Sequence, residues 1–273
     1  MNAQPPPTHR LLTGQNALVT GANSGIGEGI ARELAAAGAN VVVNYVVQPD
    51  AAQTICDDIN KAGGKAIAIR ADVSREDQVQ AMFAEAVRQF GTLDIVCSNA
   101  GIQRDAKLVD MTLDQWNQVI GVNLTGGFLV AREAAREFLR RGMRDVSCAL
   151  GKIIFTSSVH QEIPWAGHCN YATTKGGMMQ LMESIAQELA PQKIRVNSIC
   201  PGAIKTPINH KAWATPEAEA ALEKLIPCGR VGVPADVARV VAWLASDQAD
   251  YLYGASIYID GGMTLYPGFA TGG

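Results

Sequence analysis

Short apolar runs alternate with longer segments of helical period along most of the chain. The apolar runs are continuous rather than alternating with polar positions, which is typical of strands buried on both faces of a sheet. The sequence therefore predicts repeated strand–helix–strand units and a doubly wound α/β fold with a seven-stranded parallel sheet flanked by helices. The predicted strands are Asn16–Thr20, Asn40–Tyr45, Lys65–Arg70, Asp94–Ser98, Lys152–Thr156, Arg195–Cys200 and Ser256–Ile259.

The segments between these strands contain residues that commonly begin or end helices. Glycine just past a helical segment favours a left-handed C-cap, and a Ser or Thr followed three residues later by an acid or Gln resembles a capping box. The candidates are Gly38 and Gly63 for helix ends, and Ser74 with Asp77 and Thr112 with Gln115 for helix starts.

We expect a single domain over residues 13–273, preceded by a flexible, proline-rich N-terminal tail over residues 1–12. Two connections are long. Residues 140–150 form a polar insertion, and residues 206–227 lie between the sixth strand and the last helix. Because long connections in compact α/β folds are usually lids or interface elements, the second is predicted to be a lid.

Composition excludes several classes of partner. The 23 basic and 26 acidic residues give a formal net charge of −3, so the chain lacks the cationic excess that nucleic acid or a membrane surface requires. The six cysteines are interpreted as reduced thiols, and neither they nor the four histidines have metal-ligand spacing, so no metal site is predicted. Without a signal peptide or a long apolar run, we expect a cytoplasmic protein.

A glycine-rich segment directly follows the first predicted strand and begins a helix. Gly21 permits a tight turn, Gly25 permits close approach of a diphosphate, and Gly27 permits close packing of helix on strand. An ordinary glycine-rich turn is the alternative, but the position favours a Rossmann-type dinucleotide site. The loop residues predicted to contact the cofactor are Gly21, Asn23, Ser24, Gly25, Ile26 and Gly27.

Further candidates lie at the carboxyl ends of the next strands, where open α/β sheets bind ligands. Asp72 can accept from an adenine amino group or simply form a turn, and Val73 follows it. The second strand ends in Tyr45-Val46, with neither an acid that would exclude a 2′-phosphate nor a base that would bind one. We expect use of both NAD and NADP, with a modest preference for NAD. Asn99, Ala100 and Gly101 follow the fourth strand.

The candidate chemistry is a tyrosine and a lysine one helical turn apart. Tyr171 and Lys175 share a helix face, and a nearby ammonium together with a positive nicotinamide ring would lower the pKa of the phenol. Tyr171 is therefore a candidate general base, and Ser158 can hydrogen-bond the reacting oxygen. Taken alone, the pair would more often be a half-buried ring beside a surface lysine.

Together these motifs resemble the short-chain dehydrogenase/reductase family over about residues 13–265. The resemblance implies that Asn123 completes a catalytic tetrad with Ser158, Tyr171 and Lys175, and that Lys175 also binds the nicotinamide ribose. It further implies nicotinamide contacts from Pro201, Gly202, Ile204 and Thr206. The alternatives are that Asn123 is a buried residue at a helix kink and that Pro201-Gly202 is a plain turn.

Three stretches, beginning at Ser157, Pro201 and Asp260, are similar to the bacterial glucose 1-dehydrogenases within that family. This similarity implies oxidation of the anomeric hydroxyl of D-glucose, or of a related aldose, to the lactone. The expected substrate contacts are Ser158, His160, Tyr171, Gln103 and Asn209. Gln103 stands where these enzymes tend to have an acid, which weakens the expectation.

The alternatives are a short-chain reductase of a 3-oxoacyl thioester or small ketone, and a cofactor-binding regulator without catalysis. The family usually forms tetramers, so we expect a homotetramer with the last strand and the Ala235–Ala245 helix at interfaces. An apolar C-terminal segment is expected to be buried in such an interface. Its apolar residues are Met263, Leu265, Tyr266 and Phe269.

Overall fold

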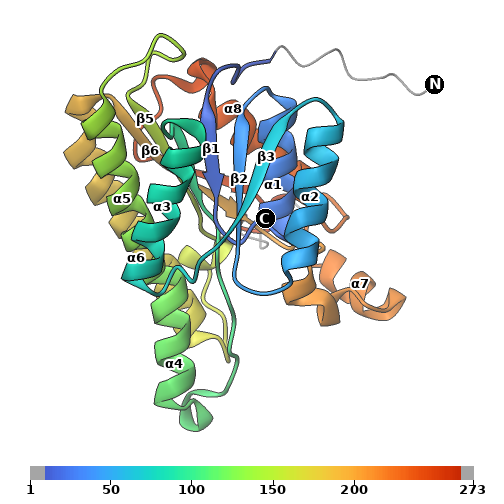
Figure 1. Ribbon diagram of the computed structural model, residues 1–273. Coiled ribbons are helices and arrows are strands. Elements are labelled where there is room, and N and C mark those ends of the chain that lie inside the picture. Colours follow the sequence, from blue (N-terminus) through green and yellow to red (C-terminus); the bar gives the residue numbers. More distant parts are fainter. Residues whose placement is uncertain (1–9, 266–273) are drawn as a thin grey trace.

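The computed structural model describes residues 10–265, which form one parallel sheet of seven strands (Figure 1). The strands are β1 (Asn16–Val19), β2 (Asn40–Tyr45), β3 (Lys65–Arg70), β4 (Ile95–Ser98), β5 (Gly151–Thr156), β6 (Ile194–Pro201) and β7 (Ser256–Ile259), in the spatial order β3-β2-β1-β4-β5-β6-β7. Every neighbouring pair is parallel. The predicted fold class and all seven strands are confirmed, with ends that differ by at most one residue.

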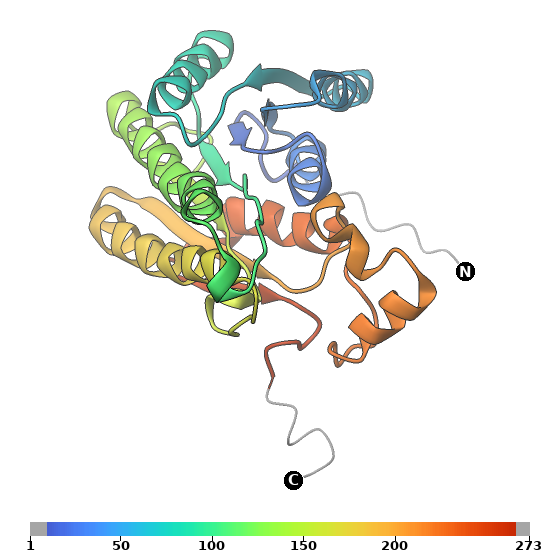
Figure 2. The same ribbon diagram turned by 90° about the horizontal axis from the view of Figure 1, so that it is seen from below.

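Helices cover both faces of the sheet, as Figure 2 shows from below. One face carries α1 (Gly25–Ala36), α2 (Pro49–Lys61) and α8 (Pro234–Ala245), and the other carries α3 (Glu76–Phe90), α5 (Gly126–Arg141) and α6 (Cys169–Leu189). Two short helices, α4 (Leu113–Val119) and α7 (Pro216–Glu223), lie beyond the edge where the strands end (Figure 1). Within residues 10–265, none of the helices has the length and apolarity to cross a membrane.

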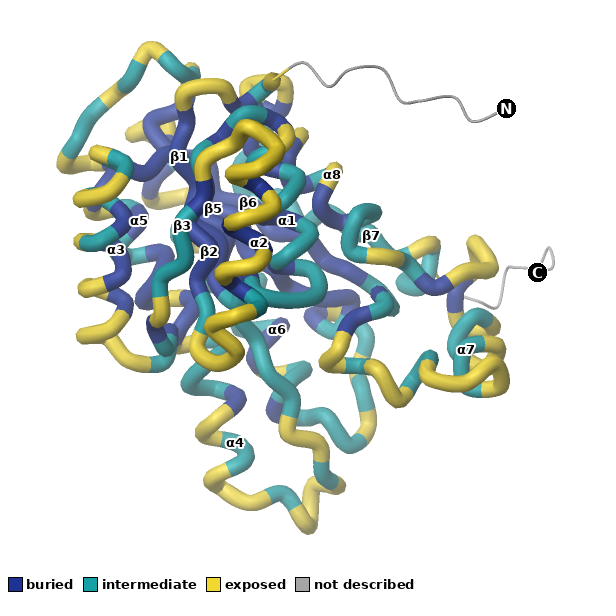
Figure 3. The backbone as a smooth tube through the Cα atoms, turned by 45° about the vertical axis from the view of Figure 1, so that its right-hand side comes forward, coloured by how far each residue is buried: buried dark blue, intermediate teal, exposed yellow. Residues whose placement is uncertain are grey.

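The core consists of two apolar layers separated by the sheet. On β1, Ala17 and Val19 pack toward α1 and α8, whereas Leu18 packs toward α3 and α5. Because side chains alternate along a strand, the continuous apolar runs supply both layers. The five inner strands β1, β2, β4, β5 and β6 are accordingly the most buried part of the molecule, whereas α4, α7 and the edge loops are exposed (Figure 3).

The predicted helix signals are only partly correct. Gly38 and Gly63 have φ of +102° and +86°, as expected for C-caps, and Thr112 with Gln115 forms a capping box on α4. The box at Ser74 is wrong, because α3 begins after Arg75. The Ser74 hydroxyl instead donates to Asp72 at 2.7 Å.

Apolar residues near the two ends of the domain lie in different surroundings. Leu12, placed in the tail, is fully buried, and its N–H donates to the Ala37 carbonyl at 2.9 Å. The folded domain therefore includes it. At the other end Leu265 is 67% exposed in the isolated chain, while Tyr266 and Phe269 lie outside the described residues.

The insertion at residues 140–150 begins as the last turn of α5 and then crosses the edge where the strands begin. Arg141 and Arg144 both contact the buried Asp94 carboxylate, at 2.9 and 2.5 Å. Further along, Ser147 accepts from the buried Lys152 ammonium and donates to Asp247. The insertion is thus held by buried charges, on the edge opposite the candidate site.

Candidate active site

The glycine loop forms a tight turn between β1 and α1. Gly21 and Gly25 each have φ of +58°, a conformation that other residues rarely adopt. At Gly27 a Cβ would lie 2.5 Å from Asn99 Nδ2, so only glycine allows this packing. The structure therefore places the three glycines in the geometry that the spacing predicts.

Asparagines on β2 and just after β4, the strands on either side of β1, hold this loop. Asn99 Nδ2 donates to the carbonyls of Thr20 and Gly21 at 2.9 and 3.2 Å. Asn44, whose role the sequence did not indicate, accepts from the Gly21 N–H at 3.1 Å and donates to Ala71 at 3.0 Å. The loop is thus tied to the ends of β2, β3 and β4.

The N-terminus of α1 is suited to an anion. Ser24 occupies the N-cap position in an extended conformation, but its side chain makes no capping hydrogen bond. Backbone N–H groups of the first turn therefore have no side-chain acceptor there, and the helix dipole favours negative charge at this point. Asn23 donates to the Val47 carbonyl at 2.9 Å and so braces the loop against the segment after β2.

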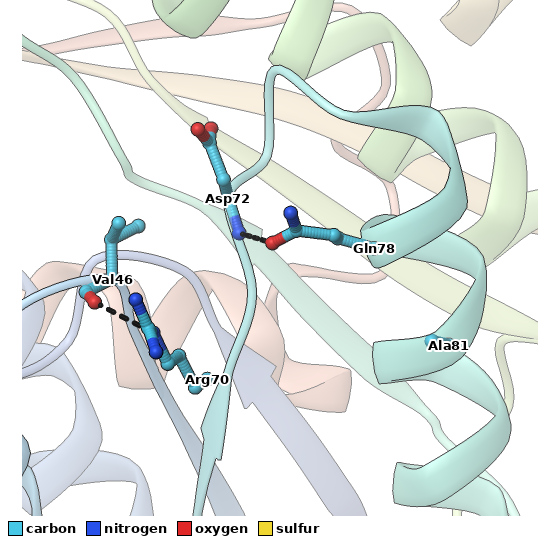
Figure 4. A pocket seen from close by; sticks show the side chains of 5 residues that line it. All are labelled: Val46, Arg70, Asp72, Gln78 and Ala81. Atoms are coloured by element: carbon cyan, nitrogen blue, oxygen red, sulfur yellow. Dashed lines mark hydrogen bonds between the residues drawn. The ribbon is translucent and has the colours of Figure 1, made fainter.

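An open pocket of about 450 Å³ lies across the ends of β2 and β3, lined by Val46, Arg70, Asp72, Gln78 and Ala81 (Figure 4). Arg70 Nε donates to the Val46 carbonyl at 3.2 Å, and the Asp72 carboxylate points away from it. A base is therefore present beside the end of β2, although the sequence near Val46 indicated none. Asp72 itself accepts from Ser74 and so forms the turn considered as its alternative role.

The strand register explains why Arg70 was missed. It is the last residue of β3 and pairs with Tyr45, the last residue of β2. The two are 25 positions apart in the sequence, and only the pairing of β2 with β3 brings them together. Val73, the next candidate after Asp72, is buried and packs toward Gly126 of α5.

Tyr171 and Lys175 lie in the first two turns of α6, with the Lys175 ammonium 5.4 Å from the centre of the Tyr171 ring. Lys175 is 3% exposed, and it donates to the Thr156 carbonyl at the end of β5 at 2.7 Å. Ser158 follows β5 and accepts from the His160 N–H at 3.2 Å. Because this bond uses a lone pair, the Ser158 hydroxyl proton remains available to another acceptor.

Burial dominates the electrostatics of these groups. It raises the pKa of Tyr171, as does the charge of Asp105, while hydrogen bonding to Ser158 and Gln103 lowers it. Burial also lowers the pKa of Lys175 to about 8. The lowered phenol pKa expected from the lysine is therefore not found in the protein by itself.

Asn123 is buried in a π-helical segment, Ile120–Thr125, that joins α4 to α5. Its Oδ1 accepts from the Ile102 N–H at 2.8 Å, and its Nδ2 donates to Thr174 of α6 at 3.3 Å. Asn123 thus connects the loop after β4 with the helix of Tyr171. It is buried, as in the alternative interpretation, and its side chain also links two elements of the site.

The segment after β6 lies against the glycine loop. Thr206 is buried, and a Cβ at Gly25 would lie 3.3 Å from it. Gly202 packs on Asp260 so closely that a Cβ would approach within 2.8 Å. Of the predicted nicotinamide residues, Thr206 therefore lies beside the glycine loop. Pro201 is the last residue of β6, Gly202 lies against Asp260, and Ile204 pairs with Gly232.

Of the predicted substrate residues, Gln103 and His160 lie beside Tyr171. Gln103 is close enough to hydrogen-bond the phenol, and the His160 ring is 6.3 Å from that of Tyr171. Asn209 is engaged elsewhere, because its Oδ1 accepts from Thr206 and from Trp213 Nε1 at 3.1 Å. It anchors the segment that we expect to be a lid.

Comparison with known proteins agrees with this geometry. A family described as Enoyl-(Acyl carrier protein) reductase matches residues 21–264. The chain is 47% identical to 3beta-hydroxysteroid dehydrogenase 1 of Eggerthella lenta, covering 96% of this chain and 98% of that one. It is 40% identical to Glucose 1-dehydrogenase 2 of Bacillus subtilis (strain 168), covering 95% and 98%.

Among solved structures, a gluconate 5-dehydrogenase from Burkholderia cenocepacia J2315 in complex with NADP and tartrate superposes with a TM-score of 0.87. It is 34% identical, and the match covers 95% of this chain and 98% of that one. The chain therefore belongs to the short-chain dehydrogenase/reductase family of oxidoreductases.

Proposed function

We propose that the protein interconverts a hydroxyl and a carbonyl group by hydride transfer with NAD or NADP. The observation that carries the proposal is the placement of Ser158 just after β5, with Tyr171 and Lys175 in the first two turns of α6, where Lys175 bonds to the end of β5. The glycine loop suited to a diphosphate follows β1 at the same edge of the parallel sheet. The nicotinamide ring, when bound, accepts or supplies the hydride, and the protein orients the substrate and moves the proton.

The side chains have complementary roles in this reaction. Ser158, which already accepts from the His160 N–H, donates its hydroxyl proton to the reacting oxygen and holds it near Tyr171. Tyr171 takes the substrate hydroxyl proton during oxidation and returns it during reduction. The Lys175 ammonium, 5.4 Å from the centre of the Tyr171 ring, stabilises the phenolate form that accepts this proton.

The residues present fit a dinucleotide. The diphosphate would be held by the N–H groups of Gly25, Ile26 and Gly27, where no side chain caps the helix. Within the described part of the chain, Lys175 has one recorded acceptor, the Thr156 carbonyl, although an ammonium has three donors. The remaining donors suit the hydroxyls of a ribose.

Arg70 changes the expected cofactor preference. A guanidinium beside Val46 is suited to a 2′-phosphate, which it can bind with two parallel hydrogen bonds. We therefore propose that NADP is bound at least as well as NAD, in place of the modest NAD preference expected from the sequence. The relative from Burkholderia cenocepacia, solved with NADP, supports this proposal.

For the substrate we propose D-glucose or a related aldose. Gln103 and His160 supply polar atoms beside Tyr171, and a polyol can bond with both. The His160 Nδ1 lies 3.0 Å from the Ile163 carbonyl, which fixes the proton on that nitrogen and leaves Nε2 as an acceptor for a substrate hydroxyl. The Bacillus subtilis relative supports this choice.

A second candidate is a 3β-hydroxysteroid. It is supported by the 47% identity with the Eggerthella lenta enzyme and by the apolar Trp165 ring, which lies 6.2 Å from the Tyr171 ring. A 3-oxoacyl carrier substrate is less well supported. Lys205, one of the few bases near the site, is paired with Glu219 at 2.5 Å.

The deciding experiment is a substrate panel. D-glucose, other aldoses, a 3β-hydroxysteroid and a 3-oxoacyl thioester would each be tested with both cofactors, following the absorbance of the reduced nicotinamide. We expect turnover of an aldose. Turnover of only the steroid or only the thioester would reassign the substrate, and turnover of none would refute the proposed function. The family also suggests a homotetramer, which light scattering at micromolar concentration would test.

A further inference from the structure

The loop after β4, residues 101–107, passes beside Tyr171 and carries Gln103. It forms neither helix nor strand, and none of its residues is fully buried. Apolar packing therefore does not fix its position, and the hydrogen bonds of its backbone must do so. Because Gln103 supplies one of the polar groups beside the phenol, the contacts that hold this loop also set the geometry of the site.

Two buried asparagine side chains hold the backbone on either side of Gln103. On one side, Asn123 accepts from the Ile102 N–H at 2.8 Å and donates to the Ile102 carbonyl at 3.0 Å. On the other side, Asn170 Nδ2 donates to the Arg104 carbonyl at 2.8 Å. Asn123 is 1% exposed and Asn170 is 0% exposed, so water competes little for these bonds.

Asn170 connects this loop directly to the candidate base. Its Oδ1 accepts from the N–H of Tyr171, the next residue, at 2.8 Å. Its Nδ2 reaches Arg104, the residue after Gln103. A single planar amide therefore links the backbone that carries the phenol to the backbone that carries the Gln103 carboxamide. Because a displacement of about 1 Å can weaken a site substantially, this link bears on how substrates bind.

We propose that Asn170 is a positioning residue that determines the preference of the protein for substrates with a second oxygen next to the reacting carbon. It does so by holding Gln103, whose carboxamide bonds to that second oxygen while Tyr171 bonds to the reacting one. A carboxamide within hydrogen-bond reach of the phenol can also reach an oxygen on the neighbouring carbon. The inference rests on the proposed function, and it gives a role to a residue that acts only through Gln103.

A purely structural role is the alternative, because a buried asparagine with two hydrogen bonds stabilises any loop. Asn197 of β6 offers a matched comparison. It is 2% exposed, donates to the Leu252 carbonyl and accepts from the Ala255 N–H, both at 2.9 Å. These partners precede β7 and so lie at the edge of the sheet opposite the site. Asn197→Ala therefore removes the same kinds of bond from an equally buried side chain far from Gln103.

The first test compares D-glucose with 2-deoxy-D-glucose, which lacks the hydroxyl next to the reacting carbon. We expect Asn170→Ala to lower kcat/KM for D-glucose about fivefold, mainly through a higher KM, because one neutral hydrogen bond is lost. The value for 2-deoxy-D-glucose should change little. Asn197→Ala should keep the wild-type ratio of the two sugars. An unchanged ratio in Asn170→Ala, or the same change in both variants, would overturn the proposal.

A double-mutant cycle tests whether Asn170 acts through Gln103. Gln103→Ala alone should lower the preference for D-glucose at least as much as Asn170→Ala does, and the double variant should lose no more than Gln103→Ala. Losses that multiply, to about 25-fold, would show that Asn170 acts elsewhere and would overturn the proposal. Asn170→Ser, which keeps a polar side chain but is too short to bond to Arg104, replaces Asn170→Ala if that variant does not fold.

Hydrogen–deuterium exchange keeps the inference separate from the proposed function, because it needs no turnover. The Ile102 and Ala106 amides of the loop donate to Asn123 and to the Gly167 carbonyl. Peptides that contain them should exchange faster in Asn170→Ala than in the wild type and in Asn197→Ala. Unchanged exchange would refute the hold on the loop whatever the substrate. Faster exchange without oxidation of any sugar would support that hold and refute the proposed function.

Discussion

At the scale of single residues, the site depends on charges held where water is excluded. Lys175 is almost completely buried and donates to the Thr156 carbonyl, and burial lowers its pKa to about 8. Burial also raises the pKa of Tyr171 and so opposes its ionisation. The protein by itself thus holds the phenol protonated beside an ammonium. We infer that the positive nicotinamide ring contributes the remaining stabilisation of the phenolate.

The first prediction at this scale concerns Tyr171→Phe. Removing the hydroxyl should reduce kcat by at least about a hundredfold, because general acid–base catalysis contributes that much or more. Cofactor binding, followed by fluorescence of the reduced nicotinamide, should change little. Tyr251→Phe is the matched control, since Tyr251 is 99% exposed. Substantial activity of Tyr171→Phe would contradict the assignment.

The second concerns Arg70→Met. Loss of the guanidinium should weaken binding of 2′,5′-ADP by about tenfold, which corresponds to one charge-assisted contact, and should leave 5′-AMP binding nearly unchanged. Calorimetric titration of the two nucleotides measures both. Arg75→Met is a suitable control, because the Arg75 side chain is 64% exposed and does not line the pocket. Equal losses for both nucleotides would contradict a 2′-phosphate contact.

At the scale of elements, the features predictable from the sequence are those whose residues lie close together along the chain. The glycine loop and the Tyr171–Lys175 turn each depend on spacings within one element, so their geometry follows from local pattern. Arg70 and Asn44 could not be found in this way, because their partners lie on other strands and the register of the sheet brings them together.

The insertion at residues 140–150 shows the same limit. Its composition identifies it only as a polar insertion, but Arg141 reaches the buried Asp94, which precedes β4 by one residue. Nothing in the spacing of these residues predicts that pair. The contact explains why an insertion can be long and still ordered, since a buried carboxylate requires its partners.

Asp94→Asn tests this account. Asp94 accepts from Arg141, Arg144 and the Asn16 N–H, and its side chain is only 3% exposed. Removing the charge leaves a buried guanidinium without its counter-charge, so the free energy of unfolding should fall by about 3 kcal/mol. Urea denaturation would measure it. Asp77→Asn, at a site 74% exposed, should lower the free energy of unfolding only slightly. An equally small loss for Asp94→Asn would show that the contacts of Asp94 with Arg141 and Arg144 do not stabilise the protein.

At the scale of the whole molecule, buried titratable groups connect stability to pH. Burial lowers the pKa of Lys152 from 10.5 to about 8, and that of Lys175 similarly. Between pH 8 and 10.5 the unfolded chain therefore holds more protons than the folded protein, so the free energy of unfolding rises with pH. Burial raises the pKa of Cys56 from 9.0 to about 11 and that of Cys97 to about 12. Above pH 9 these thiols act in the opposite direction.

Lys152→Met isolates the lysine contribution. The buried ammonium is costly below pH 8, whereas methionine carries no charge, so the variant should be most favoured relative to wild type at neutral pH. The variant lacks the hydrogen bonds of Lys152 to Gln15 and Ser147 at every pH. Their loss lowers its free energy of unfolding by a constant amount and does not change how that energy depends on pH. Urea denaturation measures the free energy of unfolding of both proteins between pH 7 and about 10. The value for the variant minus that for the wild type should therefore decrease steadily as pH rises. Lys61→Met, on the exposed side of α2, should parallel the wild type throughout. Parallel curves for Lys152→Met as well would show that this lysine is charged to the same extent in the folded and unfolded states, and that the polar cluster around it removes the cost of its burial.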